Sequence, residues 1–330
     1  MSVDAVKKYA DVFERLSAVT ALCPENTASA YLLGGEDQDG LNVTARLVAA
    51  KLGGIPMSQA FDDNADIIVY PQASAPKKTG KSKKSDGEKT RRVITVDDVR
   101  EIVGALYLTP FRLAKRFFII ENADTMSEIC QNKLLKSLEE PPPCACFILC
   151  ACGKLLQTVE SRCNRIDIPP FSVDTVTELL SRHHRDAKAV ALAARASRGN
   201  IGMAEQIMAD PEFGATYSAA LEILRLSSGS KMFAHCAAVY EKFSKERDDA
   251  VLGVMEYLLA DVARMLAGAE MVFDVNDVGS VADGFTPLSA ARSAEFVRTA
   301  RRKLASNCMP TAVMDEMILK MMEEKAICLR

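Results

Sequence analysis

The feature that most constrains the fold is a strand–helix–strand unit predicted between Lys115 and Cys163. Two short apolar runs, at 117–120 and 147–149, have the aromatic and β-branched composition of strands that are buried on both faces, as in a parallel sheet. Between them, Ser127 can cap a helix with one apolar face, and three consecutive prolines end this helix. Polar residues follow the first strand directly, at the strand end where open α/β sheets place ligand sites. The unit therefore predicts an α/β fold with a parallel sheet.

A second frame of strand, glycine-containing loop and helix comes earlier in the chain, with its strand at 30–33. In an ATP-binding loop of the form G-x-x-x-x-G-K-[ST], the lysine holds the β- and γ-phosphates and the hydroxyl holds magnesium. Here Gly35 and Gly40 are present, but Leu41 and Asn42 stand in place of the lysine and the hydroxyl residue. The loop also carries three carboxylates that repel a polyphosphate, Glu36, Asp37 and Asp39. We therefore expect a turn that keeps its glycines for shape, and no working ATP site.

Taken in order, the motifs of this region resemble the ATPase-like core of bacterial DNA polymerase III clamp-loader subunits. The matching pieces are FFIIENADTM, NKLLKSLEEPP, FIL and SRC. They resemble in turn the strand of the second nucleotide motif, the helix after it, the sensor strand and the arginine-finger motif. Within this family the chain is most similar to delta-prime subunits. The resemblance implies an AAA+-like P-loop core with a parallel sheet over 1–170, a helical lid over 171–209 and an all-α collar for oligomerisation over 210–330.

Two further positions depart from the pattern of the family's active ATPases. The resemblance implies Asp-Glu after the second-motif strand, one residue for magnesium and one to activate water. This chain has Glu121 and Asn122, and an amide cannot act as a base. Gly202 stands where active subunits carry a phosphate-contacting arginine. Arg198 could substitute, although we favour a surface arginine at a helix junction. We therefore expect no cofactor bound by this chain and no catalysis of its own, as is common among delta-prime subunits.

The SRC motif, Ser161-Arg162-Cys163, is the part of the family's catalytic machinery that the chain keeps. The resemblance implies that Arg162 acts in trans as an arginine finger, toward ATP and magnesium held by a neighbouring subunit. The alternative is a structural role, in which Arg162 pairs with a nearby carboxylate such as Glu160 or Asp167.

The resemblance implies a non-catalytic, delta-prime-like subunit of the clamp loader, within the DNA-directed DNA polymerase III holoenzyme, a nucleotidyltransferase. Its partners would be gamma/tau-like motor subunits and a delta-like wrench. The sliding clamp and primer–template DNA would be met through the complex. Two alternatives stay open: an active gamma/tau-like loader ATPase with a non-standard loop, and a P-loop small-molecule kinase. The kinase requires an intact lysine and gives no role to SRC or to the helical last third of the chain.

Charge and hydropathy limit the possible binding partners and the expected location of the protein. The 41 basic and 44 acidic side chains give a formal net charge of −3, which argues against a wholly basic nucleic-acid binder. No apolar run has membrane-spanning length and the N-terminus lacks a signal-peptide core, so we expect a cytoplasmic protein without a membrane partner. One segment, 75–92, carries eight basic against two acidic residues and is expected to be a solvated, disordered insertion. A basic arm that touches DNA or a partner is the alternative.

No metal is expected in this chain. The zinc module that many delta-prime and motor subunits insert in the core has none of its cysteines here. Four other cysteines have the spacing C-x-C-x-x-x-C-x-C, unlike the paired C-x-x-C of structural zinc sites: Cys144, Cys146, Cys150 and Cys152. They also run through a predicted buried strand, which cannot fold back to place four sulfurs around one ion.

Periodicity predicts the remaining elements. Further strands are expected at 66–70 and 164–168. One amphipathic helix is expected over 4–20, and others over 219–226, 233–243, 251–266 and 291–304. The turn-rich stretch 275–287 is expected to be a loop. Four methionines of the last segment are expected to pack in a core or an interface: Met314, Met317, Met321 and Met322.

Overall fold

The computed structural model describes residues 3–71, 93–226, 245–306 and 308–328. The chain divides into two compact units. The α/β unit contains Met1–Phe171 together with Asn200–Glu205, and the helical unit contains Ser172–Gly199 and Gln206–Arg330. The predicted basic insertion at 75–92 and the predicted helix at 233–243 lie outside the described residues.

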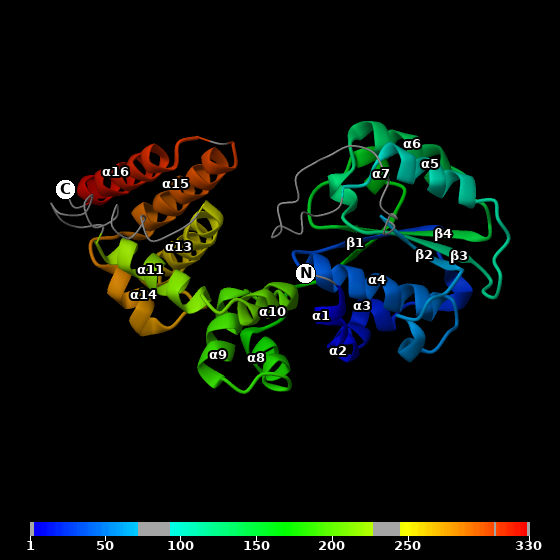
Figure 1. Ribbon diagram of the computed structural model, residues 1–330, viewed down its shortest axis with the longest axis horizontal. Coiled ribbons are helices and arrows are strands. Elements are labelled where there is room, and N and C mark those ends of the chain that lie inside the picture. The colour runs from blue at the N-terminus through cyan, green and yellow to red at the C-terminus, as the bar shows by residue number, and fades with distance from the viewer. Residues whose placement is uncertain (1–2, 72–92, 227–244, 307, 329–330) are drawn as a thin grey trace, which may run out of the picture. The chain divides into compact units, whose positions relative to one another are not determined.

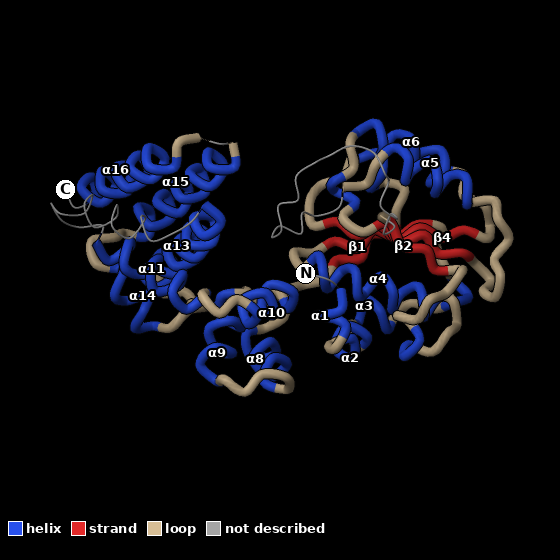
Figure 2. Tube along the Cα trace, in the orientation of Figure 1, coloured by secondary structure: helices blue, strands red, loops and turns tan. Residues whose placement is uncertain are grey.

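The α/β unit is built on a five-stranded sheet in which every neighbouring pair is parallel (Figures 1 and 2). The strand order is β2-β3-β4-β1-β5. The strands are β1 (Ala30–Gly34), β2 (Ile67–Tyr70), β3 (Arg116–Ile120), β4 (Ala145–Ala151) and β5 (Asn164–Asp167). The predicted strands are therefore confirmed, and so is the α/β fold class with a parallel sheet.

Alternation of side chains along the strands gives the sheet two apolar layers. On β3, Phe118 and Ile120 point into one layer, while Phe117 and Ile119 point into the other. The helix α4 (Gln38–Leu52) covers the second layer. Figure 1 shows three helices on the opposite face: α5 (Val96–Ala105), α6 (Glu128–Glu139) and α7 (Gln157–Glu160). The predicted caps hold: the Thr95–Asp98 capping box starts α5 and Ser127 starts α6.

The single helix expected over 4–20 is wrong. The chain forms three short helices that pack along α4: α1 (Val3–Lys7), α2 (Ala10–Glu14) and α3 (Ser17–Thr20). The backbone leaves the helical region at Leu16, where ψ is 132°. The apolar positions Val6, Phe13 and Val19 are nevertheless all buried. A straight helix would point these side chains along one line, whereas the broken path wraps them around α4.

The helical unit contains α8 (Val173–Ser181), α9 (Ala187–Ala196), the end of α10 (Ile201–Ala209), α11 (Phe213–Leu226), α13 (Lys245–Leu266), α14 (Val275–Ala282), α15 (Pro287–Ala305) and α16 (Pro310–Cys328). The helices predicted at 219–226, 251–266 and 291–304 are confirmed. The loop expected at 275–287 is wrong, because α14 occupies most of it. Asp274 caps this helix, and Val278 and Val281 are buried, so packing overrides the turn-forming residues. The division into a lid and a collar stays a prediction.

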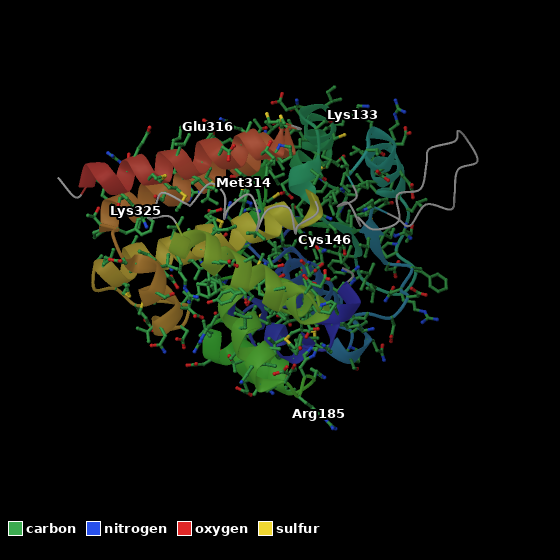
Figure 3. All side chains as sticks on the ribbon, turned by 60° about the vertical axis from the view of Figure 1, so that its left-hand side comes forward. Lys133, Cys146, Arg185, Met314, Glu316 and Lys325 are labelled. Atoms are coloured by element: carbon green, nitrogen blue, oxygen red, sulfur yellow. The ribbon has the colours of Figure 1, made fainter. Side chains whose placement is uncertain are left out.

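The core of the helical unit includes the methionines of α16, as expected. Met314, Met317 and Met321 are buried and Met322 packs against them; Met314 is labelled in Figure 3. Within the part of the chain that the structure describes, no helix is both long and apolar enough to cross a membrane.

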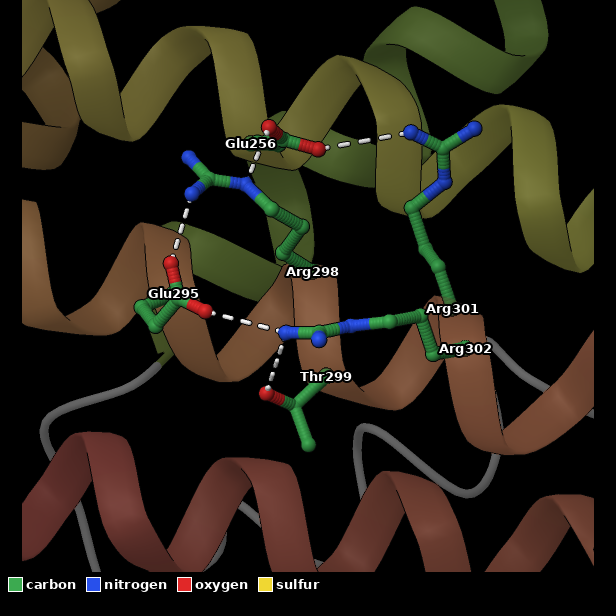
Figure 4. A network of polar contacts seen from close by, with 6 residues as sticks. All are labelled: Glu256, Glu295, Arg298, Thr299, Arg301 and Arg302. Atoms are coloured by element: carbon green, nitrogen blue, oxygen red, sulfur yellow. Dashed lines mark hydrogen bonds and ion pairs between the residues drawn. The ribbon is translucent and has the colours of Figure 1, made fainter. Parts of the chain in front are cut away.

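An ionic network joins α13 to α15 (Figure 4). Glu256 of α13 accepts from Arg298 Nε at 3.0 Å and from Arg301 Nη1 at 3.3 Å. Glu295 accepts from Arg298 at 2.6 Å and from Arg302 at 3.0 Å. Because Glu256 is only 16% exposed and its two oxygens bind different arginines, this network fixes the register between the two helices better than an isolated surface pair would.

A buried lysine makes the stability of the helical unit depend on pH. Lys325 of α16 is only 6% exposed, and its ammonium lies 3.9 Å from the Phe285 ring centroid and 3.3 Å from the Asp283 carbonyl oxygen (Lys325 is labelled in Figure 3). Burial lowers the pKa of this ammonium from its ordinary value of 10.5 to about 8. Between these two values the unfolded chain binds a proton that the folded chain has lost, so folding is favoured more as the pH rises.

We therefore expect the free energy of unfolding of the intact chain to rise relative to that of Lys325→Met as the pH increases from 8 to 10. Denaturant unfolding of both proteins at several pH values measures this difference. Lys320→Met is the control, because that lysine is 45% exposed and lies five residues earlier in the same helix. A Lys325→Met difference that stays constant with pH would contradict the expectation.

Candidate functional site

The loop between β1 and α4 keeps its two glycines for shape. A Cβ atom at Gly35 would lie 2.9 Å from the carbonyl oxygen of Ile168. A Cβ atom at Gly40 would lie 2.8 Å from a carboxylate oxygen of Asp37. Both distances are shorter than real Cβ contacts, so a side chain at either position would force its neighbours to move. The two glycines are therefore explained by the path of the turn, whether or not the turn binds a phosphate.

The two residues after Gly40 belong to the interior of the α/β unit. Leu41 is 1% exposed and packs in the apolar layer between α4 and the sheet. Asn42 is buried, and its side-chain oxygen accepts from Gln38 Nε2 at 2.9 Å. Neither residue brings a cation or a hydroxyl to the loop, which are the two groups that a phosphate and magnesium site requires.

The second motif is also bound up in structural contacts. Glu121, at the end of β3, forms an ion pair with Arg46 of α4 at 2.7 Å, and both side chains are 17% exposed. Asn122 has a left-handed backbone with φ of 53°, a conformation that asparagine adopts more readily than most residues. The carboxylate that could hold magnesium is thus already neutralised by a cation of the same chain.

Asp37 is the central residue of this site, and the sequence marked it only as one charge among three. It caps the N-terminus of α4, where one carboxylate oxygen accepts from Gly40 N at 3.0 Å. Its other oxygen accepts from Ile201 N at 2.9 Å and from Gly202 N at 3.2 Å, at the start of α10. The carboxylate therefore joins the N-termini of two helices, which is where proteins hold anions. Burial raises the pKa of Asp37, and these N–H donors oppose that rise.

Gly202 lies against this carboxylate. A Cβ atom there would be 2.9 Å from Asp37 Oδ1 and 3.0 Å from Asp39 Cβ, so the backbone approach requires glycine. The side-chain nitrogen Nδ2 of Asn200 also donates a hydrogen bond of 3.0 Å to the backbone carbonyl oxygen of Glu36. The first turn of α10 is thus bound directly to the loop between β1 and α4.

Arg198, the candidate substitute for the missing arginine, belongs to the helical unit. Its backbone is left-handed, with φ of 52°, and its guanidinium lies 4.6 Å from the Tyr257 ring centroid of the same unit. This cation–π contact is a structural role, consistent with a surface arginine at a helix junction.

The SRC motif follows the short helix α7. Arg162 Nη1 donates to the Thr158 carbonyl oxygen at 2.6 Å, and Nη2 forms an ion pair with Glu139, the last residue of α6. Burial raises the pKa of the Cys163 thiol to about 11, and that side chain packs on the α5–α6 layer. Ser161 Oγ also donates to Thr158, at 3.2 Å.

The structural alternative is right that Arg162 pairs with a carboxylate of its own chain, but wrong in naming Glu160 or Asp167 as the partner. A different arginine, Arg165, takes these two carboxylates, Asp167 at 2.9 Å and Glu160 at 3.9 Å. Arg162 instead reaches back across 23 positions of sequence to α6.

The structure brings together most of the predicted site residues but keeps the SRC motif apart from them. Arg46 and Asp37 link the loop and α4 to Glu121 and to Gly202. Figure 1 shows α7, which precedes SRC, beside α6 on the sheet face opposite α4. Val159 of α7 packs in that α5–α6 layer.

The cysteines of β4 lie in the core. Cys146 and Cys150 point into the layer under α4. Burial raises the pKa of Cys146 to about 12, and it also raises the pKa of Cys150. Since thiolates are the form that binds zinc, these thiols are poor ligands. Among the residues that the structure describes, no group of three or more His, Cys, Asp or Glu side chains is placed to hold a metal ion. A metal-free protein stays a prediction.

Comparison with known proteins gives a family match for the α/β unit. Residues 13–172 match the protein family described as "DNA polymerase III, delta subunit". This segment contains all five strands of the sheet and the SRC motif.

Individual relatives match parts of the chain. A DNA polymerase III subunit delta' from Pseudomonas aeruginosa is 34% identical over 107 residues, which are 32% of this chain and 33% of that protein. The delta' subunit from Escherichia coli is 27% identical over 208 residues, 62% of this chain and 61% of that protein. The gamma/tau subunit from Mycoplasma pneumoniae is 23% identical over 175 residues, 49% of this chain and 23% of that protein. In each case the match spans less than two thirds of the relative's own length.

Proposed function

We propose that the chain, which is similar to bacterial DNA polymerase III clamp-loader subunits over residues 13–172, acts as a loader subunit of the delta-prime kind, which binds no ATP itself. In this role it completes a neighbour's ATP site with Arg162 and takes part in ATP-dependent loading of the sliding clamp. Its direct partners are gamma/tau-like motor subunits and a delta-like subunit. The clamp and primer–template DNA are met through the complex, within the polymerase III holoenzyme.

The observation that carries the inactive ATP site is the position of Asp37. An ATP phosphate at this loop needs the N–H groups at the start of α4, a lysine and a magnesium ligand. Asp37 already accepts from the start of α4 and from the start of α10, and its charge repels a phosphate from the same place. A polyphosphate would have to displace a covalently tethered carboxylate without gaining a lysine.

Two other features support the same conclusion. Leu41 is buried in the core, so no cation occupies its position at the loop. Glu121 is paired with Arg46, so its affinity for magnesium is reduced. These contacts disfavour both the active gamma/tau-like ATPase and the small-molecule kinase, and no contact among the described residues favours either.

Isothermal titration of the purified chain with magnesium–ATP tests the inactive site, and we expect no binding in the micromolar range. The motor subunit of the same loader, titrated in the same buffer, is the positive control. Mixing the chain with the other loader subunits should give a stable complex by size-exclusion chromatography. Micromolar ATP binding by the isolated chain would contradict the proposal, and a chain that enters no loader complex would contradict the loader role.

A further inference from the structure

The guanidinium of Arg162 is held by its own chain at two places. Nη1 donates to the Thr158 carbonyl oxygen of α7 at 2.6 Å and lies 3.4 Å from Ser161 Oγ. Nη2 forms an ion pair with the carboxylate of Glu139, at the C-terminal end of α6. Two separate elements of the α/β unit therefore hold the same cation.

A further donor of Arg162, Nε, is enclosed. A guanidinium has five N–H donors, and a phosphate is bound best by two of them in parallel. Nε of Arg162 is shielded from solvent and has no hydrogen-bond acceptor within the described structure. The side chain as a whole is 31% exposed. In this arrangement Arg162 cannot offer a phosphate a paired set of donors unless it leaves Glu139 or turns away from Thr158.

Glu139 and a γ-phosphate oxygen compete for the same cation. Both are anionic acceptors, and a guanidinium neutralised by its own carboxylate stabilises less additional charge. Glu139 is 47% exposed, so solvent weakens this ion pair and the exchange of one anion for the other is easy. The neighbouring Glu140 is also exposed and forms no ion pair within the described part of the chain.

We propose that Glu139 is a positioning residue. In the unassembled or unstimulated state its carboxylate holds Arg162 in an inactive orientation, which we call parking, and a neighbour's γ-phosphate replaces this carboxylate when Arg162 engages. This inference rests on the proposed function, because it needs Arg162 to act across a subunit boundary. Glu139 of α6 thereby takes part in the control of the arginine finger. No bond is made or broken in the exchange, and the arginine stays protonated throughout.

The test compares reconstituted loaders that carry Glu139→Gln, Glu140→Gln or the unchanged chain. Glutamine keeps the shape and one acceptor but removes the charge. We expect Glu139→Gln to raise the ATPase rate measured without clamp and DNA by about two- to fivefold, the range that corresponds to a weak surface ion pair. The rate with clamp and DNA should change less than twofold, and Glu140→Gln should behave like the unchanged chain.

A double substitution separates parking from a general structural effect. In an Arg162→Ala background, Glu139→Gln should change neither rate, because its effect passes through the arginine. An unstimulated rate that does not rise in Glu139→Gln would overturn the parking role, as would a fall in the stimulated rate, which would mean that Glu139 aims the finger. If Arg162→Ala itself leaves the stimulated rate unchanged, the finger role fails first, so the two failures are distinguishable.

Discussion

Replacing Arg162 by alanine is expected to leave the chain folded and the loader assembled, but to lower the clamp- and DNA-stimulated ATPase severalfold or more. Phosphoryl transfer needs positive charge against the γ-phosphate in the transition state, and an arginine supplied by a neighbour can be worth about 10³ to 10⁵ in rate at one site. The loss for the whole loader is smaller where other sites still fire. Folding is spared because the half-exposed pair with Glu139 contributes only about 0–1 kcal/mol.

The matched control for this experiment is Arg165→Ala. Arg165 lies three residues further on, is 52% exposed and pairs with Asp167, so its loss removes the same charge from the same segment of the chain. Arg162→Lys should restore little of the activity, because lysine lacks the planar fork of the guanidinium. An unchanged ATPase rate in a correctly assembled Arg162→Ala loader would rule out the finger in trans.

The second large effect is expected at Asp37. Asp37→Ala should lower the free energy of unfolding by about 2–4 kcal/mol. Loss of the α4 cap costs about 1 kcal/mol, and the buried N–H groups of Ile201 and Gly202 lose their acceptor, at about 1–3 kcal/mol. Denaturant unfolding measures the total. Hydrogen exchange at the amides of Ile201 and Gly202 should accelerate, because these two N–H groups then lack a partner.

Glu36→Ala is the control for Asp37. Glu36 is the adjacent carboxylate and is exposed, and its contact with Asn200 runs through its backbone carbonyl, which alanine keeps. Its removal should change the free energy of unfolding by less than about 0.5 kcal/mol, as is usual for a surface site. Equal effects of the two substitutions, or unchanged exchange at Ile201 in Asp37→Ala, would show that the carboxylate does not hold the start of α10.

The sequence predicted elements that depend on local patterns. The strands at 117–120 and 147–149 were recognisable because short apolar runs rich in aromatic and β-branched residues are typical of strands that are buried on both faces of a sheet. The helix after Ser127 was bounded by its cap and by prolines, whose effects extend over one turn. By contrast, the break at Leu16 and the helix α14 were not predictable, since neither carries a local signal as strong as the packing that produces it.

The candidate site also has one part that the sequence could predict and one part that only the fold decided. Which residues stand at the nucleotide positions was read directly from motif spacing, and the absence of the lysine at Leu41 needs no structure to be seen. The contacts that take the place of a ligand there could not be predicted from the sequence, because Asp37 and Ile201 are 164 residues apart. The two residues meet only once the first turn of α10 has packed against the loop between β1 and α4. For the same reason, the sequence could not predict that Arg162 pairs with Glu139 and not with Glu160 or Asp167. An ion pair forms with the carboxylate that the fold places within about 4 Å, whatever its separation along the chain.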